Sequence, residues 1–140
     1  MDETLLEIRN WHGQGYKPLI DFGQWRVAIL RYLEALQADR IDSMERHVET
    51  DEVFVLVQGR GILMIGGRGA KIDGIRAQVM QTGEIYNVKR SVWHTILLTR
   101  DASVLIVENA DTGKANTEFD VLAPELRRLI VETAGVEQMT

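Results

Sequence analysis

The sequence contains no cysteine, which excludes disulfide bonds and any metal site built from thiolates. It also has no apolar run long enough to cross a bilayer. The segment MDETLLEIRN at the start lacks the basic, apolar and small-residue regions of a secretory signal peptide. Together these absences favour a cytoplasmic location and indicate no membrane partner.

Positive charge is scarce and scattered. The 140 residues include 16 lysines and arginines against 21 aspartates and glutamates, which gives a formal net charge of −5. The basic residues form no cluster or stripe, whereas a nucleic-acid-binding surface usually presents one. We therefore expect no nucleic-acid partner.

Several familiar catalytic motifs are missing as well. There is no glycine-rich phosphate loop, no serine in a nucleophile elbow and no HExxH pattern for a metal site on a helix. The run GGRG at residues 66–69 is rich in glycine, but strand-like segments bound it on both sides. We interpret it as a hairpin turn.

What the sequence does contain is a series of short strand-like segments separated by tight turns. Apolar residues make up 45% of the chain, which is enough for a hydrophobic core. Short strands at regular spacing predict an all-β, antiparallel sandwich or barrel. A helix is also compatible with the first segment, because short apolar runs are ambiguous. The expected strands cover residues 25–33, 53–57, 62–65, 75–80, 84–88, 92–98 and 103–107.

One helix is expected, close to the C-terminus. Pro124 suits a first helical position, and Leu126, Leu129 and Ile130 form an apolar stripe. The first fifteen residues fit either a short helix or a strand. Residues 1–140 are expected to form one domain, with a barrel core at about 16–109 and a helical segment at about 123–134.

Some of the expected strands are apolar on both faces. Every side chain in VFVLV, residues 53–57, is apolar, whereas a strand with one wet face would alternate apolar and polar residues. Both faces must therefore be covered. The barrel interior accounts for one face, and either the terminal segments or a second subunit accounts for the other. We prefer the second subunit and expect a homodimer.

Four side chains of metal-ligand type are placed so that they can meet inside such a barrel. Glu45 and His47 are two residues apart, which puts both on one face of a strand. Glu52 opens the strand at 53–57, and His94 lies in the strand at 92–98. Carboxylates and imidazoles are costly to bury without partners, and a divalent cation would satisfy all four at once.

The spacing of these residues resembles the two motifs of the cupin superfamily. The pattern ExHx4Ex6G, which begins at Glu45 and ends at Gly59, is similar to the first motif, and GEIYNVKRSVWH at residues 83–94 is similar to the second. The resemblance covers about residues 42–109. It implies a small single-domain cupin, an antiparallel jelly-roll β-barrel with a short C-terminal helix.

The resemblance also implies a ligand set. Cupin metal sites usually combine two histidines and a glutamate from the first motif with a histidine from the second. The carry-over assigns His47, Glu52 and His94 to three of these positions, and Gly59 to the turn glycine. It implies a divalent ion as cofactor and a small-molecule ligand as partner.

This sequence departs from the family pattern at the first histidine, where it has Glu45. Two imidazoles with one or two carboxylates still suit Fe(II), Mn(II), Ni(II) or Zn(II). Two carboxylates would nearly neutralise the ion and weaken it as a Lewis acid. Glu45 can instead be a base acting on a bound ligand. It can also mark a lost metal site, in which His47, Glu52 and His94 form a hydrogen-bonded polar cluster.

The pattern leaves a second register open. His47 and Glu49 can be the paired positions, but only two residues then separate Glu49 from Glu52, which the family spacing disfavours. Glu49 is therefore the weaker candidate. The second motif also has three departures, at positions that usually hold proline, glycine and asparagine. They are Lys89, Ser91 and Leu98.

These features predict a cupin that holds one divalent metal ion in its barrel and binds or acts on a small oxygenated metabolite. The resemblance allows dioxygenation, isomerisation or decarboxylation, and fold analogy does not choose among them. The alternative is a non-catalytic protein that binds a sugar or an organic acid, with or without metal. No residue is assigned a catalytic role at this stage.

Overall fold

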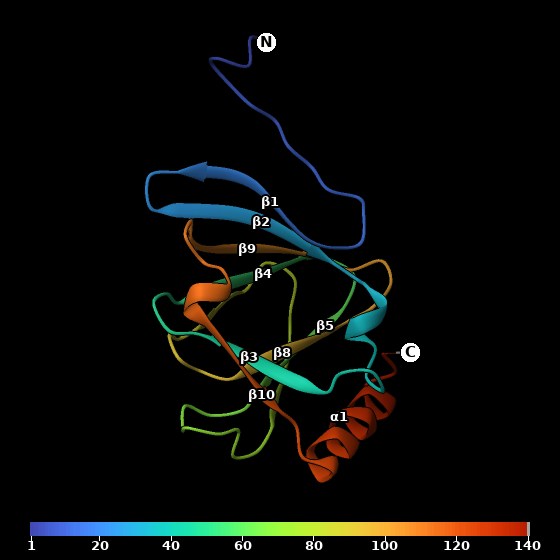
Figure 1. Ribbon diagram of the computed structural model, residues 1–140. Helices are drawn as coiled ribbons and strands as arrows, with labels where there is room; N and C mark the ends of the chain where they lie inside the picture. Colours follow the sequence, from blue (N-terminus) through green and yellow to red (C-terminus); the bar gives the residue numbers. More distant parts are fainter. Residues whose placement is uncertain (140) are drawn as a thin grey trace.

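The computed structural model describes residues 1–139, in which the strands form two five-stranded antiparallel sheets that face each other (Figure 1). This is the all-β jelly-roll barrel that the sequence predicts. Sheet A contains, in spatial order, β1 (Gly15–Phe22), β2 (Trp25–Arg31), β9 (Ser103–Asn109), β4 (Glu52–Gln58) and β7 (Ile85–Val88). Sheet B contains β10 (Thr117–Val121), β3 (Ser43–His47), β8 (His94–Leu98), β5 (Gly61–Ile65) and β6 (Arg76–Val79).

Strand β3 agrees with the strand that was expected to carry Glu45 and His47 on one face, but two other strands are not predicted from the sequence. They are β1 and β10, and each stands at the edge of its sheet. An edge strand tolerates residues that weaken the strand pattern. Pro18 in β1 is an example, because it adjoins a shift in the β1–β2 register. The segment at 25–33 is strand β2 and not a helix, since it pairs with β1 and β9 along its whole length.

The barrel interior has an apolar end and a polar end. Strands β4, β8 and β9 each turn every second side chain inward, because successive side chains alternate between the faces of a strand. The apolar end is built by Leu56, Leu98 and Val104 together with Leu63, Met80 and Ala102. The polar end consists of Glu45, His47, Glu52, His94 and Glu108.

Helix α1 (Pro124–Val136) covers the outer face of sheet B (Figure 1). Its residues Ile130 and Ala134 pack with Met44 from β3, Met64 from β5 and Trp93, which precedes β8. Trp93 is thus a packing residue, on the opposite side of the sheet from His94. Among residues 1–139, no helix is both long and apolar enough to span a membrane.

Among residues 1–139, no helix covers the outer face of sheet A in the way that α1 covers sheet B. The side chains of this face of sheet A form apolar rows across the strands, in which Ile29 pairs with Leu105 and Leu105 with Val55. These three residues are only partly buried. The residues before β1 do not protect this face, since they run away from the barrel and leave Leu5 and Ile8 exposed (Figure 1).

Gly59 makes the tight turn between β4 and β5 possible. Its φ is +74°, a left-handed conformation that side chains other than glycine adopt at a cost. A Cβ atom on this residue would also lie 2.6 Å from the Cα of Ala102. Backbone conformation and the close approach of Ala102 therefore both require glycine at residue 59, the glycine position of the first motif.

Candidate metal centre

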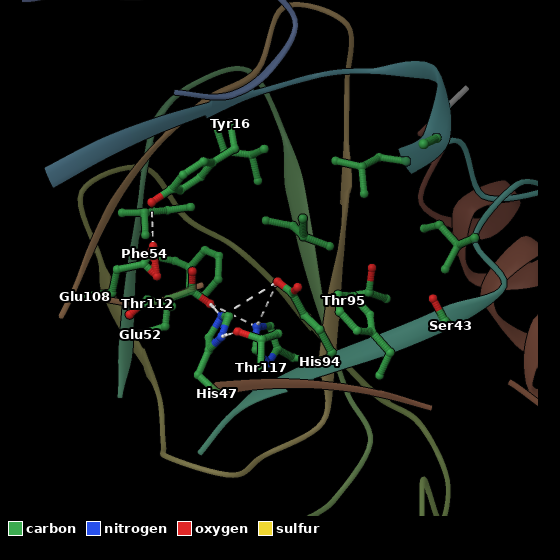
Figure 2. Close-up of a pocket in the computed structure, with 18 of the residues that line it drawn as sticks. Tyr16, Ser43, His47, Glu52, Phe54, His94, Thr95, Glu108, Thr112 and Thr117 are labelled. Atoms are coloured by element: carbon green, nitrogen blue, oxygen red, sulfur yellow. Dashed lines mark hydrogen bonds and ion pairs between the residues drawn. The ribbon is translucent and has the colours of Figure 1, made fainter. Parts of the chain in front are cut away.

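The barrel brings the four predicted ligand residues together at its polar end. Figure 2 shows three of them, His47, Glu52 and His94, pointing toward one another. Strand β3 supplies Glu45 and His47, and Glu52 and His94 are the first residues of β4 and β8. Glu45 is the cross-strand neighbour of His94. Each of the four residues offers a ligand atom, and these atoms all lie within 4.8 Å of one another.

Glu52 occupies the centre of the group. Its Oε1 lies 2.9 Å from Nε2 of His94 and 3.1 Å from Nε2 of His47. Oε1 of Glu45 is more distant, at 3.7 Å from Nε2 of His47 and 4.0 Å from Nε2 of His94. The Glu45 side chain also remains 40% exposed, while the other three are buried. Glu45 is thus the member of the group that is open to the cavity.

Hydrogen bonds on the far side of each imidazole hold its orientation. Nδ1 of His94 lies 2.9 Å from the carbonyl oxygen of Val92, and it must donate because a carbonyl only accepts. Nδ1 of His47 lies 2.9 Å from Oγ1 of Thr117 on β10. Such outer partners fix the ring position and the tautomer of metal-binding histidines. Both Nε2 atoms are left directed at Glu52.

Glu52 and the two histidines stabilise one another's charged forms. Burial alone would raise the pKa of Glu52, but hydrogen bonds from His47 and His94 outweigh it and lower that pKa to about 2. Burial likewise opposes ionisation of the two imidazoles, and the Glu52 carboxylate overcomes it, so the pKa of each histidine is raised. The pKa of Glu45 is raised by burial and by the charge of Glu52. The site therefore favours bound positive charge.

The donor set fits a divalent metal ion. A neutral His94 that donates from Nδ1 has a bare nitrogen at Nε2, facing a carboxylate oxygen at 2.9 Å. Two bare acceptors at that distance repel each other, so a proton or a cation must lie between them. Ligand atoms about 2.1 Å from a shared ion stand about 3.0–3.4 Å apart at angles near 90–110°. The Glu52–histidine separations of 2.9 and 3.1 Å lie close to this range, whereas Oε1 of Glu45 is farther from the two imidazole nitrogens, at 3.7 and 4.0 Å.

The cluster forms one wall of a cavity of about 670 Å³. This is within the usual size of a small-molecule site. Apolar side chains line much of the rest of the cavity wall. They come from β2, from the segment between β2 and β3, and from β4 and β8. They include Leu30, Leu33, Leu36, Ile41, Phe54 and Ile96. The arrangement suits a small ligand that reaches the polar end through its oxygen atoms.

Sequence analysis misses three polar residues of this region. Glu108 lines the cavity from β9, and it follows the inward alternation of Val104 and Ile106. Extending that period by one step would have identified it, but the expected strand ended at residue 107. Tyr16 and Thr117 also line the cavity, and they lie on the two edge strands that the sequence does not predict.

Glu49, the weaker alternative, lies outside the cluster. It is exposed, and its Oε2 accepts a hydrogen bond of 3.3 Å from Nδ2 of Asn116. The structure therefore favours the register that pairs Glu45 with His47.

No protein-family model matches this sequence, and no curated protein matches it. Solved structures do resemble the fold. A Streptomyces Pac13 variant solved with uridine aligns with a TM-score of 0.56 and 8% identity over 82% of this chain and 85% of that chain. KdgF from Halomonas sp. has a TM-score of 0.50 and 13% identity, covering 69% of this chain and 78% of that one.

A third similar structure is protein NMB1881 from Neisseria meningitidis. It aligns with a TM-score of 0.50 and 17% identity over 71% of this chain and 89% of that chain. At such low identities the likeness shows the fold alone. Together with the two facing sheets, it shows that the chain folds as a small β-barrel, which agrees with the fold that the motif resemblance implies.

Proposed function

We propose that Glu45, His47, Glu52 and His94 hold one divalent metal ion, and that the protein binds or acts on a small oxygenated metabolite beside it. The observation that carries the proposal is the position of Glu52 Oε1, which lies within 3.1 Å of Nε2 on both histidines. A buried carboxylate with two imidazole nitrogens aimed at it is a site built around positive charge.

The donor types narrow the choice of ion. Imidazole nitrogen with carboxylate oxygen, and no thiolate, suits Fe(II), Mn(II), Ni(II) or Zn(II). When bound, such an ion would act as a Lewis acid toward ligand oxygen atoms. The protein itself orients the imidazoles through Val92 and Thr117, and its apolar cavity walls limit the access of water. Glu45, being more exposed, is either the fourth ligand or a base that faces the ligand.

Elemental analysis of untagged protein, purified without added metal, tests the proposal. We expect near-stoichiometric metal in the wild type and its loss in His47→Ala and His94→Ala, with the fold retained by circular dichroism. His12→Ala is the matched control, because His12 is exposed and lies far from the cluster in the sequence. Absence of metal from the wild type when each of the four ions is supplied would contradict the proposal.

A metal-free binding protein is the second candidate. In the structure both nitrogens of each imidazole have a hydrogen-bond partner, so protonated histidines satisfy the cluster without an ion. Such a barrel would bind a sugar or an organic acid without turnover. Incubation with a metabolite panel separates an enzyme from a binder. Nucleosides belong in that panel because Pac13, which is similar in fold, is a nucleoside dehydratase.

We also propose that the chain forms a homodimer through the outer face of sheet A. The apolar rows that contain Ile29, Leu105 and Val55 need cover, and α1 is already packed on sheet B. The arm before β1 carries Leu5 and Ile8, and both side chains remain exposed to solvent. A second copy would bury both surfaces.

Light scattering after size-exclusion chromatography tests the dimer. We expect the wild type to have twice the mass of the chain, and Leu105→Glu and Val55→Glu to have the mass of one chain. Val131→Glu on α1 is the control, because Val131 is partly exposed on the opposite side of the molecule. A monomeric wild type would contradict the proposal.

A further inference from the structure

Glu108 is a buried acidic residue that the metal site does not use. It lies on β9, directly after Val107. Because Val107 pairs with Val53 of the antiparallel strand β4, Glu108 lies beside Glu52 at the polar end. Its residue exposure is 6%, and it lines the same cavity as the metal ligands. An ionisable side chain at this depth normally has all of its polar atoms paired.

Only one of the two Glu108 oxygens has a partner. Tyr16 on β1 donates a hydrogen bond of 2.5 Å from its hydroxyl to Oε1 (Figure 2). Within residues 1–139, Oε2 of Glu108 is the one buried side-chain oxygen or nitrogen without a hydrogen-bond partner. Glu108 lines the cavity, so a turn of its carboxyl group about the last side-chain bond brings the unpaired Oε2 to a ligand group that can satisfy it.

The nearby cation does not supply the missing bond. Arg26 is the cross-strand neighbour of Glu108, but its guanidinium donates to Oδ1 of Asp21 and to the backbone oxygens of Ala110 and Thr112. Burial and the charge of Glu52 raise the pKa of Glu108, while Tyr16 and Arg26 act against that shift. In either protonation state Oε2 needs a partner, as an acceptor when ionised or as a donor when protonated.

A hydroxyl group is the ligand chemistry that meets both requirements, because it donates and accepts hydrogen bonds. A ligand carboxylate would be repelled by ionised Glu108, and an ammonium group could not accept from protonated Glu108. We propose that Glu108, held in place by Tyr16, is a second anchoring point that binds a hydroxyl of the ligand whose other end lies at the metal site. The ligand class is therefore a small molecule with an oxygen group at one end, toward the metal site, and a hydroxyl toward the other, and this inference rests on the function proposed above.

Two matched probes test this assignment. Gluconate carries an α-hydroxy acid at one end and hydroxyls along its chain, and 2-hydroxyhexanoate carries the same α-hydroxy acid without the further hydroxyls. Their affinities for the Mn²⁺-loaded full-length chain are measured by calorimetry for the wild type, Glu108→Leu and Glu108→Gln. Leucine removes both oxygens, and glutamine keeps one acceptor and adds a donor.

We expect Glu108→Leu to lower the preference for gluconate over 2-hydroxyhexanoate by about tenfold, as the loss of about one hydrogen bond implies. Glu108→Gln should restore most of the preference. Tyr16→Phe should lower it by a smaller factor, since the anchor would remain but lose its positioning bond. A Glu108→Leu preference equal to that of the wild type, or a wild type that does not bind gluconate, would overturn the inference.

Thermal unfolding separates recognition from a structural role. A buried, half-paired carboxyl destabilises the ligand-free fold, so Glu108→Leu should raise Tm, since leucine suits the apolar neighbours on β9. A fall in Tm together with weaker binding of both probes would assign Glu108 a structural role and overturn the inference. If instead the wild type holds no metal but its preference, measured without Mn²⁺, still depends on Glu108, the metal proposal fails and only the hydroxyl anchor at Glu108 is retained.

Discussion

The two ends of the barrel interior are built from the same strands and differ in every other respect. Along β4 the inward side chains run from Glu52 at the polar end through Phe54 to Leu56 at the apolar end, and all three are buried. Strand β8 repeats this order, beginning at His94 and reaching Leu98. One backbone arrangement thus carries both an ionisable site and a hydrocarbon core.

The difference shows how stability and chemistry are divided within one small barrel. A fully buried apolar side chain contributes about 1.5–3 kcal/mol to folding. Buried charges contribute little or oppose folding unless they are paired. The apolar end therefore stabilises the fold, and the polar end depends on it. Substitutions at the two ends should separate these roles.

The largest effect is expected at Glu52, in metal affinity. Glu52→Gln keeps the size of the side chain but removes the charge between the two histidines, so metal affinity should fall by more than about 100-fold, beyond the effect of an outer partner. Titration against a competing chelator measures the change. Glu49→Gln is the control, since Glu49 is exposed and outside the cluster. Wild-type affinity in Glu52→Gln would remove this residue from the ligand set.

At the apolar end the expected loss is in stability. Leu56 is buried between the sheets, so Leu56→Ala should lower the free energy of unfolding by about 2–5 kcal/mol. Denaturant titration measures this value. The metal content of the folded variant should match that of the wild type. If Leu56→Ala lost its metal while remaining stable, the two ends would not be separate in function.

A smaller effect is expected at Thr117, which contacts the site only through His47. Thr117→Val preserves the shape of the side chain and removes the oxygen 2.9 Å from Nδ1 of His47. Metal affinity should fall by about 10–100-fold, as for other outer partners of metal-binding histidines. Thr95→Val is the control, because Thr95 lines the cavity from β8 and the Nδ1 partners of the two imidazoles are Thr117 and Val92 instead. Equal affinities of the two variants would show that Thr117 does not position His47.

The smallest effect is the pH dependence of the metal-free protein. The pKa values of His47 and His94 are raised in the fold, so their contribution to stability is complete below the unfolded value near 6.5 and is lost as pH rises through the folded values. The pKa of Glu52 is lowered to about 2, so its contribution is lost only in strong acid. The raised pKa values of Glu45 and Glu108 also reduce stability as pH rises.

The metal-free chain should therefore have a higher Tm at about pH 5.5 than at about pH 8.5. Metal binding should show the opposite trend, because protons compete for the same imidazole nitrogens. Differential scanning calorimetry with and without chelator measures both. A Tm of the metal-free chain that does not fall between the two pH values would contradict the coupling between Glu52 and the histidines.

Most of the site was predictable because its residues obey local rules. Two residues on one strand share a face, which placed Glu45 beside His47, and the motif spacing linked them to Glu52 and His94. Glu108 was within reach of the same alternation rule on β9. Tyr16 could not be predicted in this way. Its strand, β1, contains Pro18 and lies at the edge of sheet A, where tertiary contacts decide the structure and a local pattern does not.

The resemblance to the cupin motifs implied that two carboxylates and two imidazoles share one barrel, and the sequence itself determined most of the strands and the side chains of those strands that face inward. These follow from a period of two and from tight turns, which act over a few residues. Only the tertiary structure decided that α1 covers sheet B and leaves sheet A bare, and that Glu108 has one oxygen without a partner. Both depend on contacts between residues far apart in the chain, which no local pattern encodes.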